Sequence, residues 1–263
     1  MPMDRMKIVG GKPLKGSIEV GGAKNAALPI LISTLLSDDT STYTRVPILQ
    51  DIKTTLNLLS HLGVTVDDSA LKQHQVKLTA KNISEAEAPY DLVRKMRASV
   101  VVLGPLLART GYAKVSLPGG CAIGARPINF HLTGLEKLGA QIELDGGYVI
   151  ARAKKLVGAR VAFEFPSVGA TENVLMAAVL AQGESILENC AKEPEITDLA
   201  ASLRSMGAKI EGDGTGVIRV QGVSRLGGAN HQILGDRIEG GTFLAAGFAT
   251  QGDVEVKGIA PAA

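Results

Sequence analysis

"LRSMGAKIEG", residues 203–212, joins the apolar tail of a helix to an alternating strand through one glycine. Two other stretches follow the same plan, "LLSHLGVTV" at 58–66 and "LEKLGAQIEL" at 135–144. Helices commonly end just before such a glycine, because glycine adopts the left-handed conformation without a Cβ clash. The three glycines are 76 and 68 residues apart, which indicates an internal repeat. They are Gly63, Gly139 and Gly207.

Each repeat also has a front half, in which a helix of small apolar residues precedes a strand and a turn marked by proline. The sequence predicts these helices at 24–36, 96–108 and 171–181. Helices that alternate with strands indicate the α/β class. Solenoid repeats have periods of roughly 20 to 50 residues, so a unit of this length is better explained as a whole βαβαββ module. We expect three complete modules packed around shared helices.

The last 28 residues, 236–263, begin the same plan once more. The segment "GGTFLAAGFA" predicts a helix, "DVEVKG" a strand and "IAPAA" a proline turn. We therefore expect an incomplete fourth repeat. The apolar residues Phe243, Leu244 and Phe248 of its helix would have no second layer to cover them.

Composition excludes several classes of function. The net charge of the 263 residues is +2 and aromatic residues make up 3%, so nucleic acid is not expected as a partner. There is no apolar run near the roughly 20 residues that cross a bilayer, and the first residues lack the apolar stretch of a signal peptide. We expect no membrane partner and a cytoplasmic protein. Cys121 and Cys190 have neither metal-site nor disulfide spacing and should be free thiols.

Two segments combine cations with small residues. In "GGAKNAAL" (21–28), Lys24 and Asn25 stand at a predicted helix start, where free N–H groups favour anions. The alternative is an ordinary glycine turn with a surface lysine. Arg97 is followed by the small residues Ala98 and Ser99 and could hold a phosphate or carboxylate. The preceding cations of this segment fit a solvated face better.

The loop "LPGGCAIGARP", residues 117–127, is expected to be a flexible cover over a ligand. A buried structural cysteine is the usual role of a lone cysteine, and Cys190 fits it. Cys121 fits it poorly, because the neighbouring glycines offer no apolar packing and the nearby Arg126 would favour the thiolate.

Several long motifs closely resemble those of the enolpyruvyl transferase family. They include "GGAKNAALPIL", "VSLPGGCAIGARPINFHLTGLEKLGAQI", "SVGATEN" and "GDRIEGGTFLAAG". The resemblance covers nearly the whole chain and implies an inside-out α/β barrel of repeated βαβαββ units. It also implies that the strand within 1–21 belongs to a second domain, that 22–233 is the first domain with three repeats, and that 234–263 begins the second domain.

The resemblance implies transfer of the enolpyruvyl group of phosphoenolpyruvate to the 3′-hydroxyl of UDP-N-acetylglucosamine, a step of peptidoglycan synthesis, without metal or organic cofactor. Cys121 would be the acid that protonates C3 of phosphoenolpyruvate and the residue that fosfomycin alkylates. Lys24 and Asn25 would contact both substrates, Arg97 would belong to the active site, and Arg126 would hold phosphate. The residues implied at the uridine edge are Pro127, Ile128, Asn129, Phe130, Ser167, Val168 and Gly169.

Two residues depart from the family pattern, since Asn129 stands where we expect aspartate and Phe130 where we expect leucine. The family's catalytic base is an aspartate of the second domain, beyond residue 263. This leaves a second hypothesis open, a catalytically incomplete module that binds sugar nucleotide or pairs with a chain supplying the missing domain. A third hypothesis changes the acceptor to shikimate 3-phosphate, and Cys121 argues against it.

Overall fold

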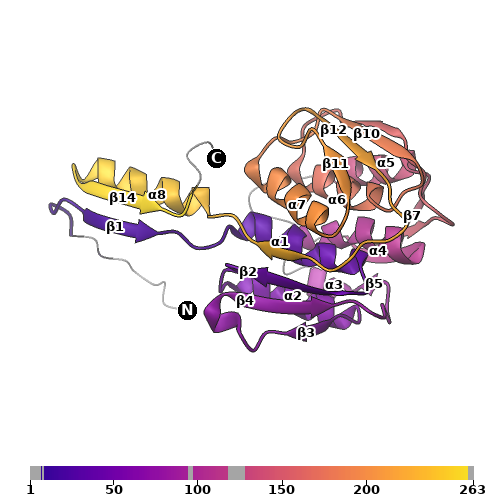
Figure 1. Cartoon of the computed structure of the whole chain (residues 1–263), viewed down its shortest axis with the longest axis horizontal. Coiled ribbons are helices and arrows are strands. Elements are labelled where there is room, and N and C mark those ends of the chain that lie inside the picture. The colour runs from indigo at the N-terminus through magenta and orange to yellow at the C-terminus, as the bar shows by residue number, and fades with distance from the viewer. Residues whose placement is uncertain (1–6, 8, 94–96, 118–127, 260–263) are drawn as a thin grey trace. The chain divides into compact units, whose positions relative to one another are not determined.

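The computed structural model describes residues 7, 9–93, 97–117 and 128–259. The chain divides into two compact units, one formed by residues 22–234 and the other by residues 1–21 with 235–263. Helices and strands alternate along the chain (Figure 1), and the predicted α/β class is confirmed. Among the described residues, no helix has the length and apolar character needed to cross a bilayer.

The larger unit contains three repeats. The first consists of α1 (Lys24–Ile32), the 3₁₀ helix η1 (Ser33–Leu36), β2 (Thr40–Thr44), α2 (Gln50–His61), β3 (Thr65–Asp67), η2 (Leu71–Gln73) and β4 (Gln75–Thr79). The second consists of β5 (Glu87–Ala88), α3 (Tyr90–Val93), η3 (Arg97–Val102), α4 (Leu103–Thr110), β6 (Tyr112–Ser116), α5 (Asn129–Lys137), β7 (Gln141–Asp145) and β8 (Tyr148–Arg152). The third consists of β9 (Arg160–Ala162), α6 (Val168–Ala178), β10 (Glu184–Glu188), α7 (Pro194–Ser205), β11 (Lys209–Glu211) and β12 (Val217–Gln221), and β13 (Asn230–Gln232) follows it.

The glycines that end the second helix of each repeat have the predicted conformation. Their φ angles are +98° at Gly63, +95° at Gly139 and +102° at Gly207. Each residue follows one position after the C-cap of α2, α5 or α7, and a strand begins two residues later. The predicted repeat is therefore confirmed at the positions from which it was inferred.

Helices occupy the interior of this unit. The small and aliphatic side chains of α1 and α6 are buried along almost the whole of both helices, and Leu103–Leu107 of α4 are buried too. The strands alternate between buried and exposed residues, as in β12, because one sheet face covers the helices and the other meets solvent. In the described ranges the unit has three separate four-stranded sheets and no closed ring of strands.

The first sheet takes its outer strand from the far end of the unit. In the second and third repeats the first strand lies parallel to the next one, β5 beside β6 and β9 beside β10. In the first repeat β13 fills this place, with Asn230 opposite Thr42 and Gln232 opposite Thr44. The chain segment after the third repeat thus completes the first.

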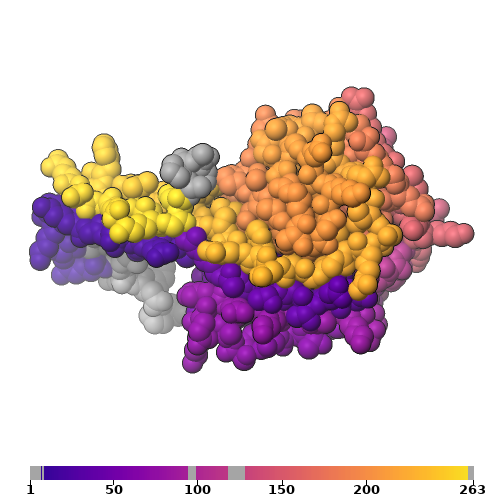
Figure 2. All heavy atoms as spheres, viewed as in Figure 1, coloured from indigo at the N-terminus to yellow at the C-terminus, as the bar shows by residue number. Residues whose placement is uncertain are grey.

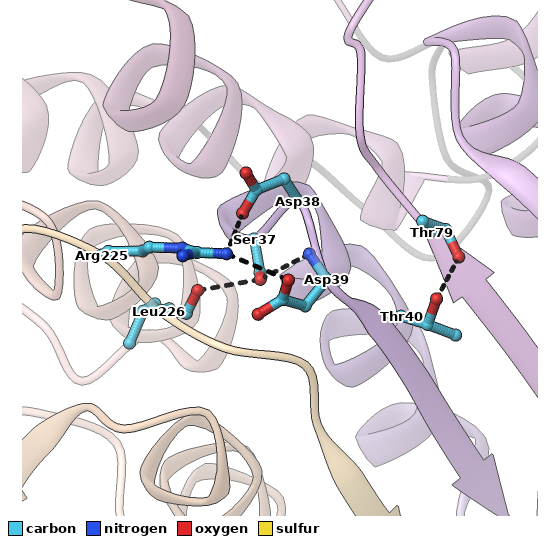
Figure 3. A network of polar contacts seen from close by, with 7 residues as sticks. All are labelled: Ser37, Asp38, Asp39, Thr40, Thr79, Arg225 and Leu226. Atoms are coloured by element: carbon cyan, nitrogen blue, oxygen red, sulfur yellow. Dashed lines mark hydrogen bonds and ion pairs between the residues drawn. The ribbon is translucent and has the colours of Figure 1, made fainter.

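Polar contacts reinforce this closure (Figure 3). The Ser37 hydroxyl donates to the carbonyl oxygen of Leu226 at 2.9 Å, and it accepts from the backbone N–H of Asp39 at 3.1 Å. Arg225 pairs with Asp38 at 3.2 Å and with Asp39 at 3.0 Å. The ion pairs are exposed and contribute little to stability, whereas Ser37 is buried and its hydrogen bonds contribute more.

The smaller unit pairs both ends of the sequence. β1 (Lys15–Glu19) lies parallel to β14 (Asp253–Lys257), with Lys15 opposite Asp253, and Figure 2 shows the indigo and yellow segments side by side. Between them in the βαβ order stands α8 (Arg237–Ala249), capped by Asp236, whose carboxylate accepts from the N–H groups of Ile238 and Glu239. In α8, Leu244 is 48% exposed and Phe248 is 90% exposed, as predicted, while Phe243 is half-buried.

Candidate functional site

The described residues of the predicted site stand at the beginnings of helices. Lys24 and Asn25 are the first two residues of α1, and Arg97 begins η3. Ile128 and Ser167 are the residues directly before α5 and α6. Helix beginnings carry free N–H groups and positive partial charge, which favour phosphates and carboxylates. Cys121, Arg126 and Pro127 lie outside the described residues.

Lys24 lies against a carboxylate that the sequence analysis did not assign to the site. Its Nζ is 3.1 Å from Oδ2 of Asp51, in the first turn of α2, and both side chains are partly exposed. Asn25 is exposed. In the sequence, Asp51 belongs to the proline turn "RVPILQDI", residues 45–52, which predicts a feature of the fold and gives no sign of a contact with Lys24. The pair fixes Lys24 at the joined beginnings of α1 and α2.

The glycine turn before α1 lies close to the backbone of Arg45. A Cβ at Gly22 would overlap the carbonyl oxygen of Arg45, so glycine is required there by packing within the unit. The sequence predicts that the small residues of this turn allow a close approach to a ligand. For Gly22 the structure supplies a different reason.

A buried polar network joins the beginnings of α5 and α6 to η3 and α4. Asn173 of α6 contacts Nδ1 of His131 at 2.9 Å through its Nδ2 atom, which also donates to the carbonyl oxygen of Val100 at 3.2 Å. Its Oδ1 atom accepts from the N–H of Gly104 at 2.6 Å. His131 is 7% exposed, and Asn173 is fully buried. The network therefore links η3, α5 and α6, the three helices that begin at or beside predicted site residues.

The two predicted uridine segments differ in how they use their side chains. Asn129 is exposed, whereas Phe130 is half-buried and packs against the hydrophobic core. Ser167 caps α6, with its Oγ accepting from the N–H of Ala170 at 3.4 Å. Gly169 lies against the imidazole of His131, because a Cβ at this glycine would be 3.3 Å from Cε1 and 3.5 Å from Nε2.

Several buried ionisable groups have shifted pKa values. Burial lowers the pKa of His131 to about 4 and raises the pKa of Cys190 to about 11. Burial, together with the charges of Glu195 and Glu193, raises the pKa of Glu172 well above its ordinary value. His131 is therefore neutral near pH 7, and burial favours the protonated form of Glu172. The predicted buried position of Cys190 is confirmed, at 1% exposure. Within the described ranges, no group of three or more side chains suits a metal ion.

We expect His131 to make the larger unit less stable in mild acid. Its pKa is about 4 in the folded protein and 6.5 when unfolded, so between these values the unfolded chain binds the proton and the folded chain does not. The stabilisation is complete above pH 6.5 and falls as the pH drops to 4, by about 3 kcal/mol in all. Urea unfolding at pH 7 and pH 5 measures about 2 kcal/mol of this loss, with His131→Gln as the control. An equal pH dependence in both proteins would contradict the expectation.

Comparisons with known proteins agree on one family. The family model of EPSP synthase (3-phosphoshikimate 1-carboxyvinyltransferase) matches residues 8–263. A protein of Paramagnetospirillum magneticum named UDP-N-acetylglucosamine 1-carboxyvinyltransferase is 57% identical over 97% of this chain and 61% of its own length. One of the same name from Nitratidesulfovibrio vulgaris is 58% identical over 96% of this chain and 60% of its own length. The chain thus spans about 60% of the length of these curated relatives.

Solved structures share the fold at lower identity. EPSP synthase from Acinetobacter baumannii has a TM-score of 0.78 and 22% identity, covering 97% of this chain and 58% of the other. The enolpyruvyl transferase NikO from Streptomyces tendae has a TM-score of 0.77 and 21% identity, covering 89% of this chain and 55% of the other. At these identities the likeness establishes the architecture alone.

Proposed function

The chain belongs to the EPSP synthase family, and from this premise we propose that it forms part of an enzyme that transfers the enolpyruvyl group of phosphoenolpyruvate to the 3′-hydroxyl of UDP-N-acetylglucosamine. The observation that carries this choice of acceptor is the 57% identity over 97% of the chain to a protein named for that reaction. A shikimate acceptor has weaker support, because the solved EPSP synthase is only 22% identical. The proposed reaction serves peptidoglycan synthesis.

The proposed chemistry is an addition followed by an elimination. The 3′-oxygen of the sugar forms a bond to C2 of phosphoenolpyruvate, its proton passes to a base, and C3 gains a proton from an acid. The tetrahedral product then loses phosphate from C2 and a proton from C3, which leaves the enol ether. Such a reaction needs an acid, a base and cations that stabilise the phosphate.

The residue roles are assigned from the resemblance. Cys121 is the acid for C3, Arg126 and Arg97 hold anionic groups of the substrates, and Lys24 with Asn25 contacts both substrates. The uridine end lies along 127–130 and 167–169. The joined beginnings of α5 and α6 support this assignment, since their N–H groups and positive partial charges suit the diphosphate of a sugar nucleotide. The base is expected outside these 263 residues.

We extend the proposal to the domains. Residues 22–233 form the first enolpyruvyl transferase domain, and residues 1–21 with 234–263 belong to a second domain. The division of the chain into units 22–234 and 1–21 with 235–263 supports this assignment, as does the pairing of β1 with β14.

Lys24→Met is expected to weaken phosphoenolpyruvate binding in the presence of UDP-N-acetylglucosamine by roughly 10- to 100-fold. The change removes a charged donor while keeping an unbranched stem, and hydrogen bonds to charged groups contribute roughly 1.5 to 3 kcal/mol. Isothermal titration calorimetry measures the affinity. Lys53→Met, on the exposed side of α2, is the matched control and should bind like the unchanged chain. Equal affinities of the two variants would argue against the assigned role of Lys24.

The same calorimeter separates the candidate functions. UDP-N-acetylglucosamine should bind and shikimate 3-phosphate should not, whereas binding of shikimate 3-phosphate alone would overturn the choice of acceptor. Phosphate release distinguishes the enzyme from a binding module. A protein that binds the sugar nucleotide and contains the remainder of the family fold, yet releases no phosphate from phosphoenolpyruvate, would support the module instead.

A further inference from the structure

His131 is polar, buried and fixed on one side by Asn173. The orientation of the Asn173 amide follows from its partners, because the N–H of Gly104 requires an acceptor and the carbonyl of Val100 requires a donor. Oδ1 of Asn173 therefore faces Gly104, and the Nδ2 donors face Val100 and Nδ1 of His131. This assigns the acceptor role to Nδ1.

The ring then has only one place for its proton. An imidazole that accepts at Nδ1 carries its N–H at Nε2 in the neutral form. Burial in the core favours this neutral form. The Nε2–H donor lies on the ring edge that faces Gly169, since Cε1 and Nε2 are the atoms nearest to the Cβ position of this glycine.

The ring also sits between segments that are far apart in sequence. His131 is the third residue of α5, directly after the predicted uridine residues 128–130, and its own N–H donates to the carbonyl of Ile128 at 3.0 Å. Gly169 is the second residue of α6. Asn173 extends the contact to Val100 of η3, the short helix that begins with Arg97. The pair therefore links α5, α6 and η3, and the imidazole of His131 lies against Gly169 of the predicted segment 167–169.

We propose that His131 and Asn173 are a positioning pair for the sugar nucleotide, which sets the spacing of the segments 128–130 and 167–169 and directs an Nε2–H donor at Gly169, at the beginning of α6. The pair acts through these segments and takes no part in bond making. This inference rests on the proposed function, because it takes the nucleotide site from it. The ligand class is a uridine diphosphate sugar.

Two variants separate positioning from plain stability. His131→Phe fills the space of the ring but removes the acceptor for Asn173, while His131→Gln keeps a side-chain oxygen that can accept. We expect His131→Phe to weaken binding of UDP-N-acetylglucosamine by about tenfold, the loss of roughly one oriented hydrogen bond, and His131→Gln to stay within about threefold of the unchanged chain. Calorimetry is performed at a temperature at which circular dichroism shows each variant folded. Equal affinities of all three folded proteins would overturn the proposal.

A measurement on the unchanged chain needs no variant. The ¹⁵N resonances of the His131 ring should identify Nδ1 as unprotonated and Nε2 as protonated, and saturating UDP-N-acetylglucosamine should shift the Nε2 and Gly169 resonances. A protonated Nδ1, or ring and Gly169 resonances that do not respond to bound nucleotide, would overturn the proposal even if His131→Phe fails to fold.

Failure of the proposed function gives a different result. If the unchanged chain binds no UDP-N-acetylglucosamine, the assignment of a nucleotide site is wrong. A uridine diphosphate sugar is then also wrong as the ligand class. Hydrogen exchange without ligand then still tests the positioning itself. Faster exchange of the amides at 129–132 and 168–170 in His131→Phe, but not in His131→Gln, would support a pair that positions these segments. Unchanged exchange in both variants would reject the positioning role.

Discussion

Gly104→Ala is expected to lower the free energy of unfolding by about 4 kcal/mol or more, a large part of the roughly 5 to 15 kcal/mol by which native proteins are stable. A Cβ at this position in α4 would overlap the backbone oxygen of Asn173 and would meet its Oδ1 atom at 2.5 Å. Backbone atoms of a buried helix cannot move aside as a flexible side chain can. The change would also break the hydrogen bond from Gly104 to Asn173.

Overpacking of a core usually costs roughly 1 to 3 kcal/mol, and here it falls on a backbone oxygen and a buried amide together. The gain in helix propensity from glycine to alanine, about 1 kcal/mol, offsets only part of this loss. Urea unfolding followed by circular dichroism measures the effect. Gly216→Ala is the control in the same unit, because a Cβ there meets only ordinary contacts with Lys192. Equal unfolding midpoints for the two variants would show that α4 and α6 adjust at little cost.

Iodoacetamide is expected to modify Cys121 at least 100-fold faster than Cys190 at pH 7.4. Cys190 is 1% exposed, and burial raises its pKa to about 11. Its thiolate is then roughly 300-fold scarcer than that of an ordinary exposed thiol with a pKa near 8.5. Cys121 lies in a glycine-rich segment with Arg126 nearby in sequence, which favours access and the thiolate.

Peptide mapping after brief labelling measures the two rates in one sample. Cys121→Ser should remove nearly all labelling, whereas Cys190→Ser should leave it unchanged. Labelling of the two thiols at similar rates would mean that the segment at 117–127 does not expose Cys121. Faster labelling of Cys190 would mean that the third repeat opens readily around the end of β10.

The repeat was predictable because its signals are local. Gly63, Gly139 and Gly207 mark helix ends through their own backbone conformation, which does not depend on distant residues. The strand partners were not predictable in the same way. β5 has two residues and β13 has three, too few for an alternating pattern, and β13 joins a sheet whose other strands lie more than 150 residues earlier.

The same distinction between local signals and distant contacts applies to the candidate site. The helix beginning at Lys24 was predicted, because a glycine turn is a short sequence signal. The helix expected at 171–181 begins three residues earlier, at Val168, after the cap Ser167. The contacts of His131, Asn173 and Asp51 could not be predicted, because they depend on which helices lie side by side. His131 and Asn173 were inside motifs already quoted, yet a polar residue within a helix gives no sign in one sequence of whether it is buried.

The pairing of β1 with β14 has a consequence for synthesis of the protein. Lys15 and Asp253 are 238 residues apart, so at roughly 5 to 20 residues per second the ribosome needs roughly 10 to 50 s to supply the partner of β1. Until then the backbone groups of β1 lack this partner strand, while residues 22–234 are synthesised between the two strands. Unpaired strand edges invite association with other chains. The charged residues Lys15 and Glu19 at the two ends of β1 oppose such association while the nascent chain waits.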